Sequence, residues 1–243
     1  MDASFDSGES PVLRDPRSLW AAGREGGAFD YGTGVKAILD LSDPEYIFQA
    51  GRDWPSFDYT KGLERLIDLK SPEFIHRAGI FWREFDYTRG MEALIALRDA
   101  ECLYKAGRFW KVFDYDRAVR IFRELASARH VYYAGKEWRT FNFPLGMDLL
   151  LELGSAEFLF YAGAHWREFD YARGLRRLLD LGNPEYLFKA GTLWREFDYP
   201  AAWQILAAGV EEGTLWRGKA FSHPRWRREL RGIWEDSVLR SGG

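Results

Sequence analysis

The fold is decided by the stretch from Ser155 to Gly182, which reads SAEFLFYAGAHWREFDYARGLRRLLDLG. It is one of seven blocks of 28 residues that follow one another without insertion or deletion: 15–42, 43–70, 71–98, 99–126, 127–154, 155–182 and 183–210. With positions numbered 1 to 28 in each block, position 8 is always Ala, position 9 Gly and position 15 Phe. A fixed period of this length is the signature of repeats that bury their apolar faces against neighbouring repeats.

Each block predicts two helices. Position 1 is Asp, Ser or Asn in every block, and these side chains cap the free amide groups of a helix start. Pro follows in four blocks, where a missing N–H is harmless. From Leu103 to Trp110, apolar residues recur at the spacing of one helix face. Position 16, Asp or Asn, predicts the start of a second helix, which Gly154 and Gly182 end in two of the blocks.

Small residues recur at two positions inside these helices. Position 9 is Gly throughout, and position 20 is Gly in five blocks and Ala in the other two, as Ala118 and Ala202. Because Gly inside a helix costs about 1 kcal/mol relative to Ala, its recurrence predicts close backbone contact between paired helices. Trp at position 12 and Phe at position 15 are expected to fill the space around that contact, which accounts for much of the Trp content of 11.

The run from Leu103 to Leu125 resembles the tetratricopeptide repeat. It has a small Gly late in the first helix, an aromatic three residues on, and the pair Asp114-Tyr115 at the helix restart. It also has Ala118 in the second helix with an aromatic four residues later. The resemblance covers 15–210, although the period of that family is 34 residues. It implies an all-α fold, an α-solenoid whose helical hairpins form a right-handed superhelix and whose first helices line a concave face that binds partner proteins.

The ends of the chain depart from the repeat. Residues 1–14 are expected to be a flexible tail, 15–210 to form seven two-helix repeats, and 211–243 to form a C-terminal capping helix and tail. On the capping helix, one face carries Trp226, Leu230, Ile233 and Trp234. The opposite face carries Arg225, Arg227, Arg228 and Arg231, for which docking of a partner is the weaker hypothesis. In the first repeat, Gly26 and Gly27 replace the Trp and its neighbour, as expected where one side of a terminal repeat meets water.

Composition excludes several classes of protein. The 243 residues carry 34 basic and 37 acidic side chains, so a general nucleic-acid or membrane coat is not expected. The single Cys102 excludes an internal disulfide framework. The start lacks a signal peptide and no run is long enough to span a membrane, so a cytoplasmic protein is expected. We find no catalytic motif, and the histidines share no repeat position, so neither an enzyme, a cofactor nor a metal site is predicted.

Position 6 offers the best functional lead, because it is aromatic or His in every repeat. On a helix it lies beside the apolar stripe, and basic residues at positions 10 and 13 are expected to continue the same strip. The candidate partner-binding residues are Phe48, His76, Tyr104, Tyr132, Phe160 and Phe188 with Arg52, Arg83, Arg108, Lys111, Lys136, Arg139, Arg167 and Arg195. A plain alternative is that the aromatic column only packs between successive first helices.

Three functions fit this pattern. The leading hypothesis is a non-enzymatic module or scaffold that binds a peptide or protein of acidic and apolar character in an aromatic and basic groove. The alternative is binding of single-stranded nucleic acid along the same groove, which would weaken steeply with salt. A structural spacer is the third. Replacing Arg83, Arg139 and Arg167 together with Glu would separate a spacer from a groove, because only groove binding would suffer.

Overall fold

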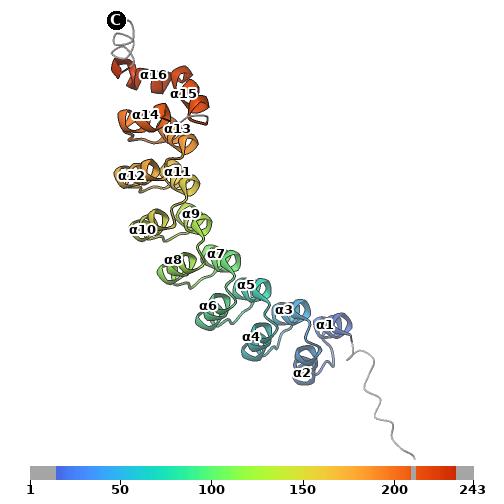
Figure 1. Cartoon of the computed structure of the whole chain (residues 1–243). Helices are drawn as coiled ribbons and strands as arrows, with labels where there is room; N and C mark the ends of the chain where they lie inside the picture. The colour runs from blue at the N-terminus through green and yellow to red at the C-terminus, as the bar shows by residue number, and fades with distance from the viewer. Residues whose placement is uncertain (1–14, 209–211, 234–243) are drawn as a thin grey trace, which may run out of the picture. The chain divides into compact units, whose positions relative to one another are not determined.

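A computed structural model of the chain describes residues 15–208 and 212–233 (Figure 1). All regular elements in these ranges are α-helices, which confirms the predicted all-α class. In each repeat the first helix occupies positions 2–11 and the second begins at position 17. The helices are α1 Pro16–Glu25, α2 Tyr31–Leu41, α3 Pro44–Asp53, α4 Tyr59–Asp68, α5 Pro72–Phe81, α6 Tyr87–Ala96, α7 Ala100–Phe109, α8 Tyr115–Glu124, α9 Ala128–Glu137, α10 Phe143–Leu153, α11 Ala156–His165, α12 Tyr171–Leu181, α13 Pro184–Leu193, α14 Tyr199–Ala208, α15 Glu212–Ser222 and α16 Pro224–Glu229.

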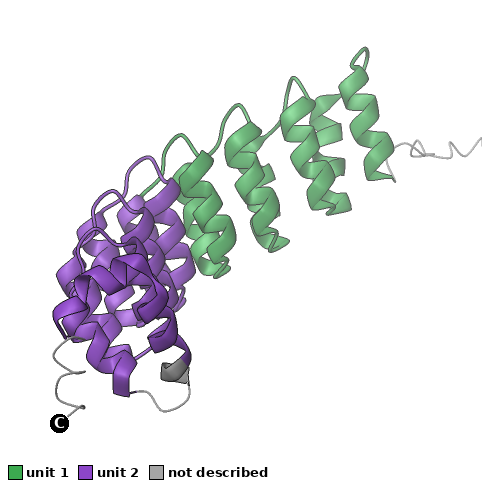
Figure 2. Ribbon diagram, turned by 90° about the horizontal axis from the view of Figure 1, so that it is seen from above, with its two compact units in different colours: residues 1–114 green, residues 115–243 purple. Residues whose placement is uncertain are grey.

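The chain divides into two compact units, residues 1–114 and 115–243 (Figure 2). In unit 1 the first helices α1, α3, α5 and α7 pack side by side in chain order. Each of α2, α4 and α6 packs against the first helix of its own repeat and of the next. In unit 2 the row of first helices is α9, α11 and α13, with α15 beside α13, and α10 and α12 pack against it in the same way. Each unit is therefore a tandem stack of helical hairpins, as an α-solenoid requires.

The side chain at position 1 caps the first helix in five of the seven repeats, whereas Ser71 and Ser127 form no capping hydrogen bond. The Asp43 carboxylate accepts from the N–H of Glu45 at 3.0 Å, and that of Asp170 from the N–H of Arg173 at 3.0 Å. In the first six repeats, position 28 follows the second helix in a left-handed conformation, which Gly154 and Gly182 adopt at little cost. Four other repeats force a non-Gly residue into the same conformation: Ser42, Lys70, Arg98 and Ala126. The repeat geometry, and not the local residue, therefore sets the turn.

At five junctions within the two units, the Trp at position 12 links a repeat to the one before it. Trp82 follows the last residue of α5, is 5% exposed, and donates from its indole Nε1 to the carbonyl of Phe48 at 3.0 Å. Equivalent bonds join Trp54 to Trp20, Trp110 to His76, Trp166 to Tyr132 and Trp194 to Phe160. The acceptor is always the position-6 carbonyl of the preceding first helix. The indole thus bonds to the helix on which it packs, and it leaves no buried donor unpaired.

The Gly at position 9 makes room for that indole. A Cβ on Gly51 would lie 2.5 Å from Cε2 of Trp82, and one on Gly163 would lie 2.4 Å from Cε2 of Trp194. The expectation of direct backbone contact between paired helices is wrong here, because the Trp of the next repeat fills the space. The Gly at position 20 accommodates the Phe of its own repeat, since a Cβ on Gly62 would lie 2.5 Å from Cε1 of Phe57.

The C-terminal end reproduces this link without an eighth repeat. Trp226 of α16 is fully buried and donates to the carbonyl of Phe188 at 3.2 Å, and a Cβ on Gly191 would lie 2.4 Å from its ring. Leu230 is also fully buried. These two residues occupy the capping face that the sequence predicts, and Ile233 is half-buried. The predicted Trp234 of the same face lies outside the described residues.

Two details of the cap differ from the expectation. A separate helix, α15, precedes the short α16, because Pro224 starts a new helix after Ser222. Arg225 does not belong to an outer basic face: its guanidinium donates to the carbonyls of Thr192 at 3.0 Å and Trp194 at 2.8 Å. It thereby satisfies carbonyl groups at the end of α13. Arg227 and Arg228 are exposed as expected.

The N-terminal end begins with α1. Gly26 and Gly27, which stand where later repeats have Trp and its neighbour, both adopt positive φ. The predicted flexible tail, residues 1–14, lies outside the described residues. Within 15–208 and 212–233, none of the helices combines the length and apolar character that crossing a bilayer would require.

Candidate partner-binding face

The aromatic column at position 6 is buried, so the expectation that these rings line an open surface is wrong. Phe48 is 0% exposed, and His76, Tyr104, Tyr132 and Phe160 are at most 9% exposed; Phe188 is half-buried. Side chains of the next repeat cover the rings: Phe74 lies 6.0 Å and Phe81 6.1 Å from Phe48, between ring centroids. The packing interpretation therefore explains most of each ring, and direct partner contact at position 6 stays a prediction.

The two basic positions lie on different parts of the repeat. Position 10 is on the first helix, and Arg52, Arg108 and Lys136 are exposed there. Position 13 follows the end of that helix, so a single helical strip through positions 6, 10 and 13 is not formed. The exposed side chains in this turn are Arg83, Lys111, Arg139, Arg167 and Arg195. Arg167 stacks on Phe143 of the second helix α10, with the guanidinium carbon 5.5 Å from the ring centroid.

Position 11, the last residue of each first helix, carries the exposed apolar groups that sequence reasoning missed. Phe81 is 54% exposed and Phe109 50% exposed, at the ends of the adjacent helices α5 and α7 in unit 1. In unit 2, Leu193 is 60% exposed. The signal was available in the sequence, because position 11 reads Glu25, Asp53, Phe81, Phe109, Glu137, His165 and Leu193. Two successive Phe in an otherwise mostly polar column indicate a local surface.

At four junctions within the two units, position 11 contacts position 6 of the preceding repeat, and three of these four pairs match in polarity. The Trp20 indole donates to the Asp53 carboxylate at 3.1 Å. The Tyr132 hydroxyl and Nδ1 of His165 share a hydrogen bond of 2.9 Å. Phe48 and Phe81 form an apolar pair. In these pairs the position-11 side chain lies against the position-6 ring. Its polarity therefore decides whether a polar group at position 6 finds a hydrogen-bond partner.

His76 and Phe109 form the mismatched pair. Their ring centroids lie 6.3 Å apart, and His76 is 5% exposed. Neither imidazole nitrogen has a hydrogen-bond partner within the described ranges. Burial lowers the pKa of His76; nearby Lys105 and Arg77 act in the same direction, while Glu73 opposes them. The imidazole is therefore held neutral near pH 7, under a half-exposed Phe that offers it no bond.

Basic side chains lie on the same two helices as the exposed Phe, α5 and α7. Arg108 places its guanidinium carbon 5.1 Å from the centroid of Phe109. Arg77 lies 4.4 Å from the centroid of Phe48 and is engaged with aromatic rings. Lys105 lies 3.9 Å from the Glu73 carboxylate and 3.7 Å from that of Glu101. We call the surface formed by Arg77, Phe81, Lys105, Arg108 and Phe109 the Phe81–Phe109 face.

Reactive chemistry is not concentrated on this face. Burial raises the pKa of the Cys102 thiol to about 12, and the Asp99 and Glu73 carboxylates add to the shift. The thiol is therefore protonated at neutral pH and is a poor nucleophile. Among the described residues, no group of three or more His, Cys, Asp or Glu side chains is arranged to hold a metal ion. No family model, curated protein or solved structure matches this chain.

Proposed function

We propose that this protein is a non-enzymatic interaction module that binds a protein or peptide partner of apolar and acidic character. Its first-helix surface provides the site, and the Phe81–Phe109 face is the centre of that site in unit 1. The observation that carries the proposal is the pair of half-exposed Phe side chains on adjacent helices, with the Arg108 guanidinium beside Phe109. Aromatic and Arg side chains are the types that dominate the energetics of protein interfaces.

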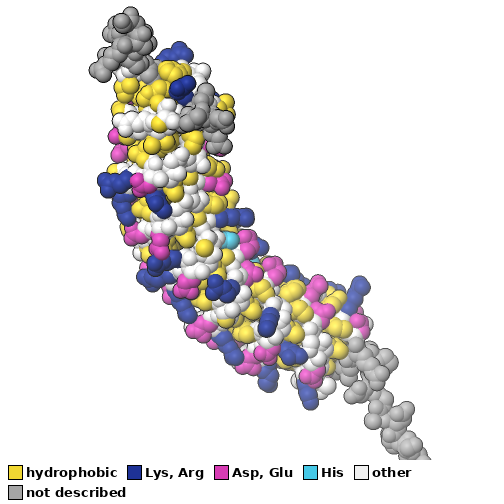
Figure 3. Space-filling view, viewed as in Figure 1, with side chains coloured by type: hydrophobic (Ala, Val, Ile, Leu, Met, Phe, Trp, Pro, Cys, Tyr) yellow, Lys and Arg dark blue, Asp and Glu magenta, His cyan; other side chains and the backbone are white. Residues whose placement is uncertain are grey.

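The arrangement of charge supports a protein partner over single-stranded nucleic acid. Base stacking needs open aromatic faces, whereas most position-6 rings are covered by the next repeat. Figure 3 shows basic and acidic side chains interspersed over the face that it displays, with no broad basic track. The Phe81–Phe109 face itself carries Arg77, Lys105 and Arg108, with Glu73 and Glu101 beside Lys105. A partner with one or two carboxylates near an apolar anchor would complement it.

The proposal extends to the kind of repeat and its setting. We take the 28-residue unit to be a shortened relative of the tetratricopeptide repeat, acting as an adaptor in the cytoplasm. In that family the first helices present the partner-binding surface, which agrees with the choice of α5 and α7. The repeat array offers its partner side chains on successive helices about 10 Å apart, the usual spacing of packed helices.

The test is selection of binding peptides from a random peptide display library, followed by titration of an enriched peptide. The wild-type chain should enrich sequences with an aromatic or apolar residue beside Asp or Glu. The double variant Phe81→Ser/Phe109→Ser should bind the enriched peptide at least about tenfold more weakly. Leu215→Ser is the matched control, because Leu215 is 58% exposed on α15. Undiminished binding by the double variant would refute the proposal.

A further inference from the structure

Unit 1 and unit 2 contain equivalent hollows between successive second helices. One lies between α4 and α6 and is bounded by Tyr59, Leu63 and Phe85. Another lies between α10 and α12, where Phe143, Met147 and Phe169 take the same repeat positions. Their volumes are about 290 and 300 Å³. They therefore represent the ordinary packing of this repeat.

A salt bridge spans the two second helices at each of these hollows. Arg89 at position 19 donates to the Glu64 carboxylate, at position 22 of the preceding repeat, at 2.8 Å. Arg173 donates to the Asp148 carboxylate at 2.7 Å in the equivalent place. The cation comes from the later repeat and the carboxylate from the earlier one. The two bonded side chains tie the helices together along one edge of each hollow.

The first junction of unit 1 lacks that carboxylate. Position 22 is Lys36 on α2, so a basic side chain takes the place of Glu64 or Asp148 opposite Lys61 of α4. Lys61 pairs instead with Asp58 of its own helix start, at 2.9 Å. Within the described part of the chain, the Lys36 side chain takes part in no ion pair or hydrogen bond. Smaller residues also line this junction: Gly32 replaces Thr60 or Pro144, and Ser56 replaces Glu84 or Glu168.

The consequence is a larger cavity. The hollow between α2 and α4 has a volume of about 690 Å³, more than twice that of the other two, and lies in the size range of small-molecule sites. Its apolar wall consists of Tyr31, Val35, Leu39 and Phe57. Lys36 and Lys61 line the same cavity, on opposite helices. It thus combines an apolar wall with two ammonium groups that have no bridging carboxylate between them.

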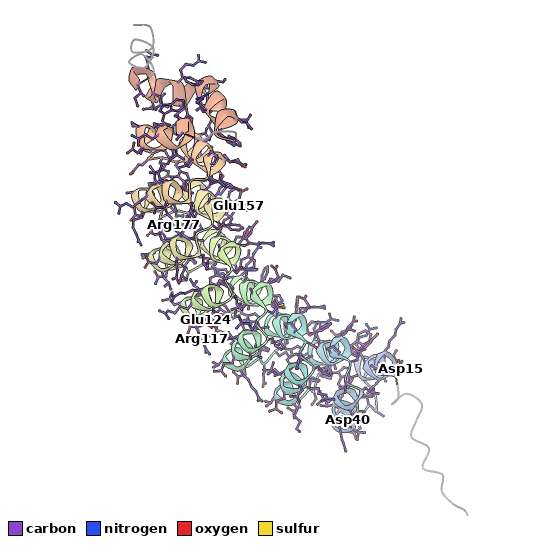
Figure 4. All side chains as sticks on the ribbon, in the orientation of Figure 1. Asp15, Asp40, Arg117, Glu124, Glu157 and Arg177 are labelled. Carbon is purple, nitrogen blue, oxygen red and sulfur yellow. The ribbon has the colours of Figure 1, made fainter. Side chains whose placement is uncertain are left out.

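We propose that this cavity binds a monocarboxylate with an apolar body, whose carboxylate takes the place of the missing position-22 acid between Lys36 and Lys61. The apolar part of the ligand packs on Tyr31, Val35 and Phe57. Asp58 and Asp40, the latter labelled on α2 in Figure 4, also line the cavity. These two carboxylates balance the charges of Lys36 and Lys61, so the cavity has no excess positive charge to hold a second negative charge, and a monoanion is preferred to phosphate. The site is separate from the Phe81–Phe109 face, so neither proposal depends on the other.

The experiment titrates the full chain with 4-phenylbutyrate and follows backbone amide chemical shifts. Saturable shifts should appear in residues 31–40 and 56–61, at one equivalent per chain. The uncharged amide of the same acid should bind at least about tenfold more weakly, because it cannot form charge-assisted hydrogen bonds. The proposal is overturned if 4-phenylbutyrate gives no saturable shifts in these segments, or if its amide binds equally well.

Two charge-reversal variants extend the test: one should abolish binding at this cavity, and the other should create binding at the second hollow. Lys36→Glu should form the ordinary bridge to Lys61 and abolish binding, while the circular dichroism spectrum and melting temperature show that the chain remains folded. Glu64→Lys places a Lys opposite Arg89, so it should open the second hollow and add a weaker second equivalent with shifts in residues 59–64 and 84–89. Unchanged binding in Lys36→Glu would overturn the proposal. A single equivalent in Glu64→Lys would overturn the claim that the position-22 charge controls the cavity.

Discussion

The junction between α5 and α7 and the junction between α9 and α11 have the same interior, formed by the position-12 Trp and the position-9 Gly. They differ at the rim, which is the contact between the side chains at position 6 and position 11 of the next repeat. In the first, the Trp110 indole donates to the carbonyl of His76 at 2.9 Å; in the second, Trp166 donates to Tyr132 at 3.0 Å. A Cβ on the position-9 Gly would collide with the indole in both. At the rim, Tyr132 bonds to His165, whereas the equivalent pair in the first junction leaves His76 without a bond.

The difference separates what the repeat needs from what it is free to vary. The indole, the Gly and the position-6 carbonyl recur at five junctions within the two units because they hold the first helices together. Position 11 lies at the helix end and changes from Asp to Phe, His or Leu without altering the stack. Function is therefore expected at the rim, and stability in the interior.

Removing an interior Trp should have the largest effect. Trp166→Ala deletes a side chain that is 5% exposed and leaves the space beside Gly135 empty. We expect the free energy of unfolding to fall by about 3–5 kcal/mol, measured by urea denaturation. Phe109→Ala, which truncates a half-exposed rim residue, should cost less than about 1 kcal/mol. Equal losses in the two variants would contradict the division between interior and rim.

Adding one methyl group to the interior should also destabilise the chain. A Cβ on Gly135 would lie 2.5 Å from Cε2 of Trp166, so Gly135→Ala should cost about 1–3 kcal/mol in spite of the better helix propensity of Ala. The control is Gly218→Ala in α15, where a new Cβ would have no neighbour within 4 Å. That variant should be stabilised by up to about 1 kcal/mol. A rise in melting temperature for both variants would contradict this prediction, because it would show that the Trp166 indole can move to make room for the added methyl group.

The rim mismatch predicts a pH dependence that starts near neutrality. The pKa of His76 is lowered in the folded chain, so above the unfolded value of about 6.5 both states are neutral. Below this value His76 becomes protonated in the unfolded chain but stays neutral in the folded chain. As the pH decreases below about 6.5, the free energy of unfolding therefore decreases, by at most about 1.4 kcal/mol per pH unit. The decrease stops when the pH reaches the lowered pKa of His76 in the folded chain.

His76→Phe should remove this contribution, because Phe stands at position 6 in three other repeats and fits the site. The variant should be no less stable than the wild type at pH 8 and more stable at pH 5, in urea titrations at both values. The carboxylates of Asp30 and Asp58, whose pKa values are lowered by their hydrogen bonds to Thr33 and Lys61, act only at more acid pH. Parallel curves for the two chains between pH 5 and 8 would contradict the prediction.

The smallest effect concerns the helix ends. Ala126 adopts φ of 51°, a left-handed conformation that costs a residue with a Cβ about 1 kcal/mol. Ala126→Gly should therefore stabilise the chain by up to about 1 kcal/mol, read from the shift in urea midpoint. Gly154 already occupies the equivalent position, so Gly154→Ala should produce the opposite shift. A loss of stability in Ala126→Gly would show that the turn is not strained.

Sequence alone is sufficient for the repeat, the helix pairs and most of the N-caps, because these depend on local periodicity and on single residues such as Asp43 or Asp170. It fails at Ser71 and Ser127, whose side chains do not cap their helices. It was not sufficient for the role of Gly51, because the indole that requires it belongs to the next repeat, 31 residues later. The same limit explains the candidate site. Position 6 was assigned to the surface from its angle on a single helix, whereas burial of Phe48 results from Phe74 and Phe81 of the next repeat.

The cavity at Lys36 is the opposite case. The sequence contains the relevant difference, a Lys at position 22, but only the structure shows what that position does. A Lys at position 22 is unremarkable until Arg89 and Glu64 are seen to bridge the helices. Arg177, labelled on α12 in Figure 4, is similar: its guanidinium donates to the carbonyl of Leu151 in the preceding repeat at 2.9 Å. Such contacts between repeats can be recognised only when equivalent positions of several repeats are compared in the structure.

Hydrogen exchange of the wild-type chain, measured with and without a library-selected peptide, locates the surface on which a partner binds. If the first-helix rim binds partners, the peptide should slow exchange of the amides in 73–81 of α5 and 101–109 of α7. Exchange in the second helices α4 and α6 should stay unchanged. Slowed exchange confined to the second helices, or no change in α5 and α7 at saturating peptide, would contradict the account.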